Sequence, residues 1–518
     1  MLRTPVRQHL WYWGGPFAVT LLAAILRLWH LGMPRGIVFD ETFYVKDAWT
    51  MLHLGYEGSW PQEAGAEPGS IDRLFGGGNV NNWTATGSFV AHPPLGKWLI
   101  ALGLRLFGAQ NIVGWRITTA LAGVVAVFIL ILIARMIFKS TMLATLAGLL
   151  FAIDGSAITL SRTALLDNFV MLFALLGFGA ILLDRHHSRA RLEHWVSTRS
   201  AEAQLRGVGW GPTQWFRPWL VAAAVAFGAA SAVKWSGLYF LAAFMIYVLV
   251  VDGLARRRVG ISSWGIDVLF KQAVPTFLIT IPIAAATYLA SWIGWFATSG
   301  GFYRNYADIP GQAATGFFRW VPHAIQSFYQ YQTAVLNFNV NEKNPHSYAA
   351  NPFSWLVLNR PTAFFYSSQA TGSEGCISPD SCAVYVTSIP NPIIWYASVF
   401  ALVYLTYRVI RYREWQVGLI LMGTVAGYVP WLFFSHRTIF QFYTIVFEPY
   451  LILGLVLVLA MILGKRTDPH WQRRTGIIVT ATFVVLAVAV SAFFYPVNAG
   501  MQIPLWFANM HYIAPGWR

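Results

Sequence analysis

The sequence predicts an all-α, polytopic integral membrane protein, and three observations lead to this prediction. Of the 518 residues, 56% are hydrophobic and only 11% are charged, with a mean hydropathy of +0.52, a balance far from that of soluble domains. The apolar residues gather in runs close to the length of about 20 residues that a bilayer-spanning helix needs. The positive residues, which give a net charge of +15, lie in short segments between these runs, so a nucleic-acid-binding domain is excluded.

Runs of mostly apolar residues predict eleven spanning helices in a single domain covering residues 1–518. The first group contains residues 15–31, 112–138, 141–158, 168–183 and 219–233. The second group contains residues 238–251, 273–292, 392–407, 417–434, 439–463 and 477–494. Charged groups at the ends of such spans are expensive to bury, so each is a candidate functional residue.

The distribution of Lys and Arg predicts how the chain crosses the membrane, because these residues concentrate in short cytoplasmic loops. Basic residues follow the fourth, sixth, eighth and tenth runs, among them Arg185, Arg256, Arg408 and Lys465. The segment 33–98 instead contains seven carboxylates against four basic residues. We therefore expect a cytoplasmic N-terminus, an exoplasmic C-terminus and two long exoplasmic loops, at residues 33–98 and 293–391.

The only two cysteines, Cys376 and Cys382, fall in the second of these loops. An oxidising exoplasmic environment would allow them to form a disulfide, and two unpaired thiols are the alternative. A zinc site would need further ligands nearby, and none has suitable spacing.

Adjacent carboxylates, Asp40 and Glu41, follow the first run closely. Such a pair near a membrane surface can provide a general base and its partner, because mutual repulsion and partial burial move the two pKa values apart. A solvated acidic loop is the alternative interpretation.

Basic residues are predicted to approach the same outer face. Lys97, with His92 before it in His-Pro-Pro-Leu-Gly-Lys, begins an amphipathic stretch at residues 95–107, where it could bind a lipid phosphate or snorkel to the interface. Arginines bind phosphate well through their planar fork, or they pair with carboxylates in the protein. The other candidates at this face are Arg27, Arg116, Arg162, Asp167, Lys234 and Arg437.

Three motifs together resemble the protein O-mannosyltransferase family: Asp-Glu after the first run, His-Pro-Pro-Leu-Gly-Lys, and Ser-Arg-x-x-Leu-Leu-Asp before the fourth. The resemblance implies the C-type glycosyltransferase fold with eleven spans. It also implies Asp40 as catalytic base, Glu41 as its acidic partner, and Arg27 and Arg116 near the donor phosphate. The loop 293–391 is too short for the β-trefoil domain of eukaryotic members, so the chain resembles the bacterial, actinobacterial branch.

The resemblance further implies the reaction and its partners. The donor would be polyprenyl phosphate mannose, and the acceptor a Ser or Thr hydroxyl of an exported protein at the cell membrane, which would place the enzyme beside the secretion machinery. A divalent metal is compatible with the many carboxylates, but no ligand spacing requires one. Two other functions fit less well: transfer of a polyprenyl-phosphate sugar to a lipid or cell-wall glycan, and secondary transport, which would place charges at the bilayer midplane.

Overall fold

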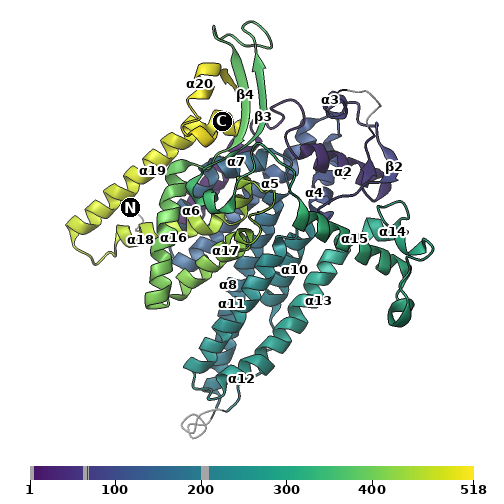
Figure 1. The fold of residues 1–518 in the computed structure, drawn as a ribbon. Coiled ribbons are helices and arrows are strands. Elements are labelled where there is room, and N and C mark those ends of the chain that lie inside the picture. The colour runs from purple at the N-terminus through teal and green to yellow at the C-terminus, as the bar shows by residue number, and fades with distance from the viewer. Residues whose placement is uncertain (1–4, 62–66, 68, 200–208, 518) are drawn as a thin grey trace.

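The computed structural model describes residues 5–61, 67, 69–199 and 209–517, and the chain forms a helical bundle with a smaller region of loops, short helices and strands at one end (Figure 1). Each of the eleven apolar runs coincides with a helix or a pair of helices. The first six runs correspond to α1 (Pro5–Leu28), α5 (Ile112–Phe138), α6 with α7 (Thr141–Ile153, Gly155–Arg162), α8 (Asp167–Ser197), α10 (Pro218–Val233) and α11 (Gly237–Arg258). The last five correspond to α13 (Val274–Ser291), α16 (Pro392–Tyr412), α17 (Trp415–Leu432), α18 (Glu448–Leu463) and α19 (His470–Ala499).

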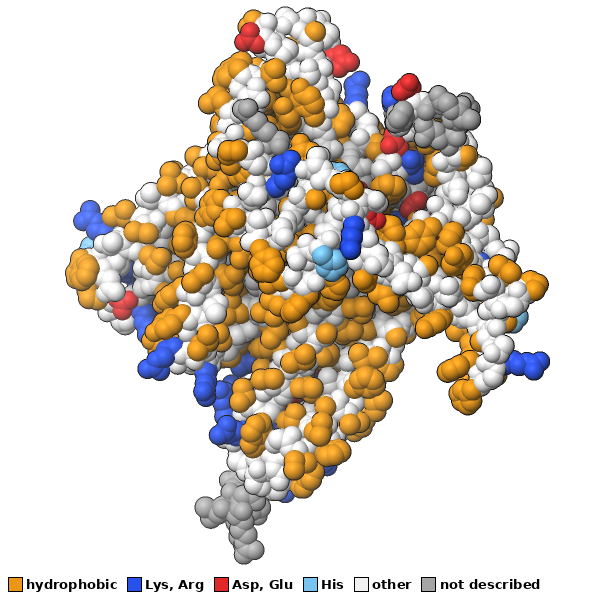
Figure 2. Space-filling model, in the orientation of Figure 1, with side chains coloured by type: hydrophobic (Ala, Val, Ile, Leu, Met, Phe, Trp, Pro, Cys, Tyr) orange, Lys and Arg blue, Asp and Glu red, His pale blue; other side chains and the backbone are white. Residues whose placement is uncertain are grey.

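In the described ranges, seven helices are long and apolar enough to cross a membrane, and the bent pair α6 and α7 would make eight. The helices α10 and α18 are apolar but shorter. Helices suit the apolar interior of a membrane, because a helix pairs its backbone N–H and C=O groups within its own segment. Figure 2 shows hydrophobic side chains covering the sides of the bundle, while Lys and Arg gather towards its lower end.

Two of the predicted runs were wrong in detail. Residues 141–158 do not form one straight helix, because the chain bends by 61° between α6 and α7. Asp154 causes a new helix to begin there: its side chain accepts hydrogen bonds from the backbone N–H groups of Ser156 (2.8 Å) and Ala157 (3.2 Å). In the run 439–463, a 3₁₀ helix, η5 (Gln441–Val446), precedes α18, which begins only at Glu448, next to a proline suited to a helix start.

The expected loop 33–98 contains short elements of its own. They are α2 (Glu41–Leu54), β1 (Gly58–Ser59), α3 (Ser70–Gly76), β2 (Thr84–Gly87) and the start of α4 (Leu95–Phe107), which occupies the amphipathic stretch predicted from sequence. The strands β1 and β2 pair antiparallel. The loop therefore folds against the bundle instead of extending freely.

The expected loop 293–391 is also structured. It contains α14 (Ile293–Ala297), η2 (Tyr306–Asp308), η3 (Gly316–Trp320), α15 (His323–Asn341), η4 (Pro352–Val357), β3 (Thr362–Gln369) and β4 (Cys382–Ser388). The hairpin of β3 and β4 projects from the end of the bundle (Figure 1), and β5 (Gln502–Pro504) pairs with β4 to give the order β3-β4-β5. The other short elements are α12 (Trp264–Val268), the π-helix η1 (Leu269–Ala273), α20 (Leu505–Asn509) and η6 (Pro515–Trp517).

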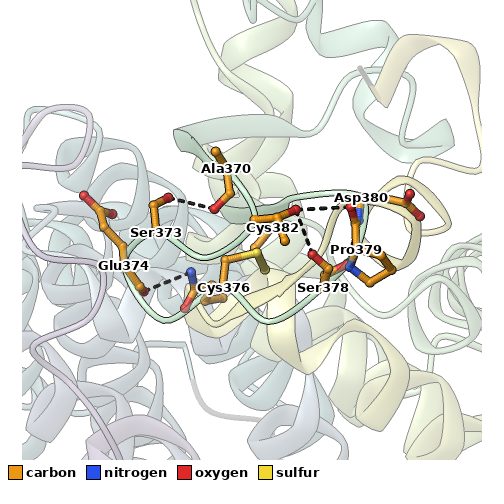
Figure 3. Close-up of a disulfide and its surroundings, with 10 residues drawn as sticks. Ala370, Ser373, Glu374, Cys376, Ser378, Pro379, Asp380 and Cys382 are labelled. Carbon is orange, nitrogen blue, oxygen red and sulfur yellow. Dashed lines mark hydrogen bonds between the residues drawn. A yellow bond between two sulfur atoms is a disulfide. The ribbon is translucent and has the colours of Figure 1, made fainter.

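Cys376 and Cys382 form a disulfide at the tip of this hairpin (Figure 3). The bond closes the short loop 376–382, and the hydroxyl of Thr371, which precedes this loop, donates to the carbonyl oxygen of Ser378 at 2.9 Å. The cross-link therefore holds together the turn that joins β3 to β4.

Buried ion pairs join α8 to both ends of α10. Lys234 contacts Asp167 at 2.7 Å at one end, and Arg217 pairs with Asp184 at the other. Asp167 and Asp184 are 17 residues apart, as are Arg217 and Lys234, so both pairs of positions span about 26 Å of helix. This equal spacing fits two packed helices, and the charge of Lys234 acts on Asp40 at the start of α2.

Candidate active site

The segment that precedes α2 positions Asp40. Phe39 has a left-handed backbone conformation with φ +49°, and its ring packs on Phe364 of β3 with centroids 5.0 Å apart. A non-glycine residue in this conformation is strained, and such strain persists where the surroundings hold the chain in place. Asp40 follows as the N-cap of α2. The backbone therefore turns sharply at Phe39, immediately before Asp40 and the start of α2.

Glu41 is fully committed to protein contacts, unlike Asp40. Its carboxylate is buried and accepts hydrogen bonds from Arg116 Nε (2.7 Å) and Nη2 (2.9 Å). It also accepts from the backbone N–H groups of Val38 and Ala164, each at 2.9 Å. Glu41 thus ties the start of α2 to α5 and to the turn before α8, which makes it a positioning residue.

Within the described ranges, the side chain of Asp40 has one hydrogen bond, from the hydroxyl of Tyr44 at 3.2 Å. Burial raises the pKa of Asp40 to about 6, the charge of Lys234 opposes that rise, and the charge of Asp167 adds to it. A carboxylate with a pKa close to the working pH is suited to accept a proton in a reaction. Of the adjacent pair, Asp40 is therefore the better candidate for a general base.

A cavity of about 100 Å³ is lined by four of the residues selected from sequence, His92, Asp167, Lys234 and Arg437. Tyr443 and Trp431 contribute aromatic walls. The influence of Lys234 and Asp167 on the pKa of Asp40 places this carboxylate beside the same group of charges. The cavity thus combines cations, a carboxylate and aromatic surface next to a candidate base.

The cations of the cavity differ in their pairing. Lys234 is paired with Asp167 and lies over the ring of Tyr443 at 4.9 Å. Arg437 has no carboxylate within ion-pair distance among the described residues, and its buried Nε has no hydrogen-bond partner there. An unpaired guanidinium of a residue that lines a cavity is suited to bind an anion.

His92 is placed to act as a neutral group. Its ring lies 6.1 Å from that of Tyr44, centroid to centroid. Burial lowers the pKa of His92 well below its ordinary value, and the charges of Lys234, Lys97 and Arg437 lower it further. A hydrogen bond from the ring to the backbone of Ala91 opposes this lowering only in part. The imidazole is therefore uncharged at neutral pH, and its single N–H is engaged by Ala91.

The donor-phosphate role expected for Arg27, Arg116 and Lys97 does not fit their contacts. Arg116 donates to Glu41 and to backbone oxygens, including that of Gly36 at 3.0 Å. Arg27 is buried and donates to oxygens of Ser161, Ala152 and Phe151. Among the described residues, Arg116 uses all five of its N–H donors in this way and Arg27 uses four, so neither is arranged as an open fork for a phosphate.

Lys97 and Arg162 also hold the protein together. Lys97 is buried between Glu57, with which it forms an ion pair, and Asp47, at 3.7 Å. Burial raises the pKa of Asp47 to about 7, against the opposing charge of Lys97. Arg162 donates to carbonyl oxygens at the end of α1, including that of Trp29 at 2.7 Å, and to Ala499, as a cation at a helix C-terminus does.

Comparisons with known proteins identify the family. Two family models match: "Dolichyl-phosphate-mannose-protein mannosyltransferase" over residues 91–198 and "C-terminal four TMM region of protein-O-mannosyltransferase" over residues 324–514. A polyprenol-phosphate-mannose–protein mannosyltransferase of Mycolicibacterium smegmatis (strain MKD8) is 33% identical, over 98% of this chain and 93% of its own length. The chain belongs to the protein O-mannosyltransferase family.

Further similarities agree with membership of the protein O-mannosyltransferase family. A polyprenol-phosphate-mannose–protein mannosyltransferase of Mycobacterium tuberculosis is 32% identical, over 96% of this chain and 91% of its own length. The structure of the S. cerevisiae protein O-mannosyltransferase Pmt1–Pmt2 complex bound to the sugar donor shares the fold, with a TM-score of 0.71 at 14% identity over 98% of this chain and 92% of that chain. The resemblance read from the motifs is confirmed, and the chain is a membrane glycosyltransferase.

Two tyrosines of this protein O-mannosyltransferase were not selected from sequence. Tyr44 donates to Asp40, and Tyr443 faces Lys234. The spacing of four residues between Asp40 and Tyr44 was a usable signal, because side chains at i and i+4 meet on a helix. No local pattern marks Tyr443, although it follows Arg437 by only six residues and lies in η5. In the described part of the chain, no group of three or more His, Cys, Asp or Glu residues is arranged to hold a metal ion.

Proposed function

We propose that this enzyme transfers mannose from polyprenyl phosphate mannose to Ser or Thr hydroxyls of exported proteins, at the exoplasmic face of the cell membrane. The observation that carries the proposal is the available carboxylate of Asp40 beside a cavity with Lys234 and Arg437. The relatives that match nearly the whole chain support it by their names. Acceptors on exported chains would place the enzyme near the secretion machinery.

The proposed topology has eleven spans, with the N-terminus in the cytoplasm and the C-terminus outside. Its support is the helix found at each of the eleven apolar runs. The basic residues at the ends of α8, α11 and α16 also support it, because they lie at the end of the bundle away from α2 (Figure 1). In this orientation Asp40 and the cavity face the exoplasmic side.

In the proposed reaction the acceptor oxygen attacks the anomeric carbon of mannose while the bond from that carbon to the phosphate oxygen breaks. Asp40 takes the hydroxyl proton, and polyprenyl phosphate leaves with the bonding electron pair. A single displacement inverts the configuration, so a β-linked donor gives an α-linked product. A phosphate leaves without protonation, so the second catalytic acid of glycosidases is unnecessary.

We assign the phosphate to the cations of the cavity. Lys234 and Arg437 would stabilise the negative charge that grows on the leaving phosphate, and His92 would line the cavity as a neutral group. Preorganised charges of this kind lower the barrier because they need no rearrangement during the reaction. Glu41 and Arg116 would hold the segment that carries Asp40.

Replacing Arg437 with Gln is expected to lower kcat/KM for the lipid donor by about 10- to 100-fold, the value of one hydrogen bond to a charged group. The KM for the acceptor peptide is expected to stay within a factor of about two, because the contact is to the phosphate. Steady-state kinetics with each substrate varied in turn measures both. Arg319→Gln, an exposed arginine of η3 outside the cavity, is the matched control, and equal losses in both variants would refute the assignment.

The activity is expected to fall as the pH is lowered through about 6, because Asp40, whose pKa is raised to about 6, must be ionised to accept a proton. Below that pH, kcat/KM should drop by about tenfold per pH unit. A pH profile of transfer by the intact enzyme checks this. The residual activity of Asp40→Asn should show no inflection near pH 6, and an inflection that persists in this variant would assign the titration to another group.

The function is tested by transfer of radiolabelled mannose from polyprenyl phosphate mannose to a Ser/Thr-rich peptide, in membranes that contain the enzyme. Labelled peptide is expected with the intact enzyme and not with membranes that lack it. The alternative function, transfer to a lipid or cell-wall glycan, predicts label in the lipid fraction and none in the peptide. That outcome would refute transfer to a protein acceptor and would still agree with the proposed lipid donor.

A further inference from the structure

A second cavity, of about 340 Å³, lies at the end of the bundle away from Asp40, between α8, α11, α16 and α17. The proposed transfer reaction makes no use of it. Five arginines line it, together with apolar side chains that include Val250, Leu254 and Met422. The five arginines are Arg185, Arg189, Arg256, Arg258 and Arg413.

The carboxylates that line this cavity are already paired. Glu193 pairs with Arg189 at 2.8 Å, Glu414 with Arg408, and Asp252 with Arg217 at 2.6 Å. Each of these carboxylates therefore has its counter-charge in the protein.

Three of the lining arginines have no such counter-charge. Arg256 pairs with Asp267, whereas Arg185, Arg258 and Arg413 have no carboxylate within ion-pair distance in the described ranges. Three positive charges around one cavity repel one another, so an anion bound between them would relieve that repulsion.

Arg185 is held in place by its surroundings. Its guanidinium lies over the ring of Trp415 at 3.7 Å, and its buried Nε has no hydrogen-bond partner in the part of the chain that the structure describes. A stacked guanidinium keeps its planar fork in a fixed orientation, which suits the oxygens of a phosphate.

The apolar wall distinguishes between anions. Val250 and Leu254 line the cavity and are also exposed on the side of the bundle, by 55% and 43%. A free phosphate ion would gain nothing from this wall, whereas a lipid could place its chain along it and its head group at the arginines.

We propose that this arginine-lined cavity binds the phosphate head group of an anionic membrane lipid. Basic residues at this end of the bundle are also expected because Lys and Arg concentrate on the cytoplasmic side of a membrane protein. That preference does not require several arginines to line one cavity. The proposal is independent of the mannosyl transfer at the other end, so each can fail without the other.

The test compares lipid retention by purified enzyme in detergent, measured by native mass spectrometry with dioleoylphosphatidylglycerol and dioleoylphosphatidylcholine as probes. The double variant Arg258→Gln, Arg413→Gln is expected to bind the anionic probe about 10- to 30-fold more weakly than the intact enzyme. The control is Arg257→Gln, Arg411→Gln, which removes the same charge from neighbouring residues that do not line the cavity. Equal losses in both double variants would overturn the proposal.

A second variant separates a lipid from soluble phosphate. Gly418 lines the cavity, and a Cβ added there meets only Val409, at 3.7 Å, so Gly418→Leu fills part of the space without changing any charge. It is expected to lower retention of the anionic lipid by about tenfold or more. Displacement of the lipid by millimolar inorganic phosphate, with no effect of Gly418→Leu, would overturn the lipid assignment. Unchanged melting temperatures show that each variant is folded.

Discussion

Asp40→Asn is expected to lower kcat for mannosyl transfer by about 10²- to 10⁴-fold, the range that a general base contributes. The amide has nearly the shape of the carboxylate and can still accept the hydrogen bond from Tyr44 (3.2 Å in the native protein). It cannot accept the proton of the acceptor hydroxyl. The donor KM is expected to change little, since the phosphate is assigned to Lys234 and Arg437. Transfer of radiolabelled mannose to a peptide, with each substrate varied, measures both quantities.

The control for Asp40→Asn is Asp308→Asn. This change removes an exposed carboxylate of η2 that pairs with His323 of α15. It is expected to leave kcat within a factor of about two, as surface substitutions usually do. If Asp40→Asn keeps full activity, Asp40 is not the base. A normal yield of folded variant in detergent shows that a loss of activity is not a loss of fold.

Glu41→Ala is expected to lower the free energy of unfolding by about 3–5 kcal/mol, because it leaves the guanidinium of Arg116 buried without its carboxylate. The side chains of both partners are fully buried, with exposed fractions of 0%. The same change removes the acceptor for the backbone N–H groups of Val38 and Ala164. Thermal unfolding of the detergent-solubilised protein measures the loss.

The double variant Glu41→Leu, Arg116→Leu separates pairing from packing. It removes both charges together, so it is expected to be more stable than Glu41→Ala despite its two changes. Arg116→Gln tests the phosphate role read from the sequence. A variant that folds like the native protein but has a raised donor KM would return Arg116 to the donor site, whereas a loss of stability fits the role argued from its contacts.

Much of the helical architecture could be predicted from the sequence, because lipid requires long apolar helices. The range 112–138 matches α5 at both ends. The surroundings of the bend at Asp154 could not be predicted from composition, because the second oxygen of that carboxylate accepts a hydrogen bond from the backbone N–H of Asn391, at 2.8 Å. That contact joins residues 237 positions apart, which no local pattern reveals.

The sequence predicted which residues belong to the candidate site better than it predicted the role of each residue. The sequence marked Asp40, Lys234 and Arg437 as charges near one face, and the cavity brings Lys234 and Arg437 together beside Asp40. The sequence equally marked Arg27 and Arg116, which are buried and bound to the protein. An arginine that binds phosphate and one that binds carbonyl oxygens look alike in sequence, since the same donors serve both.

The sequence by itself determined the membrane environment, the helical class and the family, because composition, span length and local motifs are properties of short stretches of chain. Only the tertiary structure decided which of two adjacent carboxylates is available. Four hydrogen bonds from α5, the turn before α8 and the segment before α2 occupy Glu41, and one from Tyr44 leaves Asp40 available. The difference arises because neighbouring side chains at a helix start point in different directions, and packing then determines what each one meets.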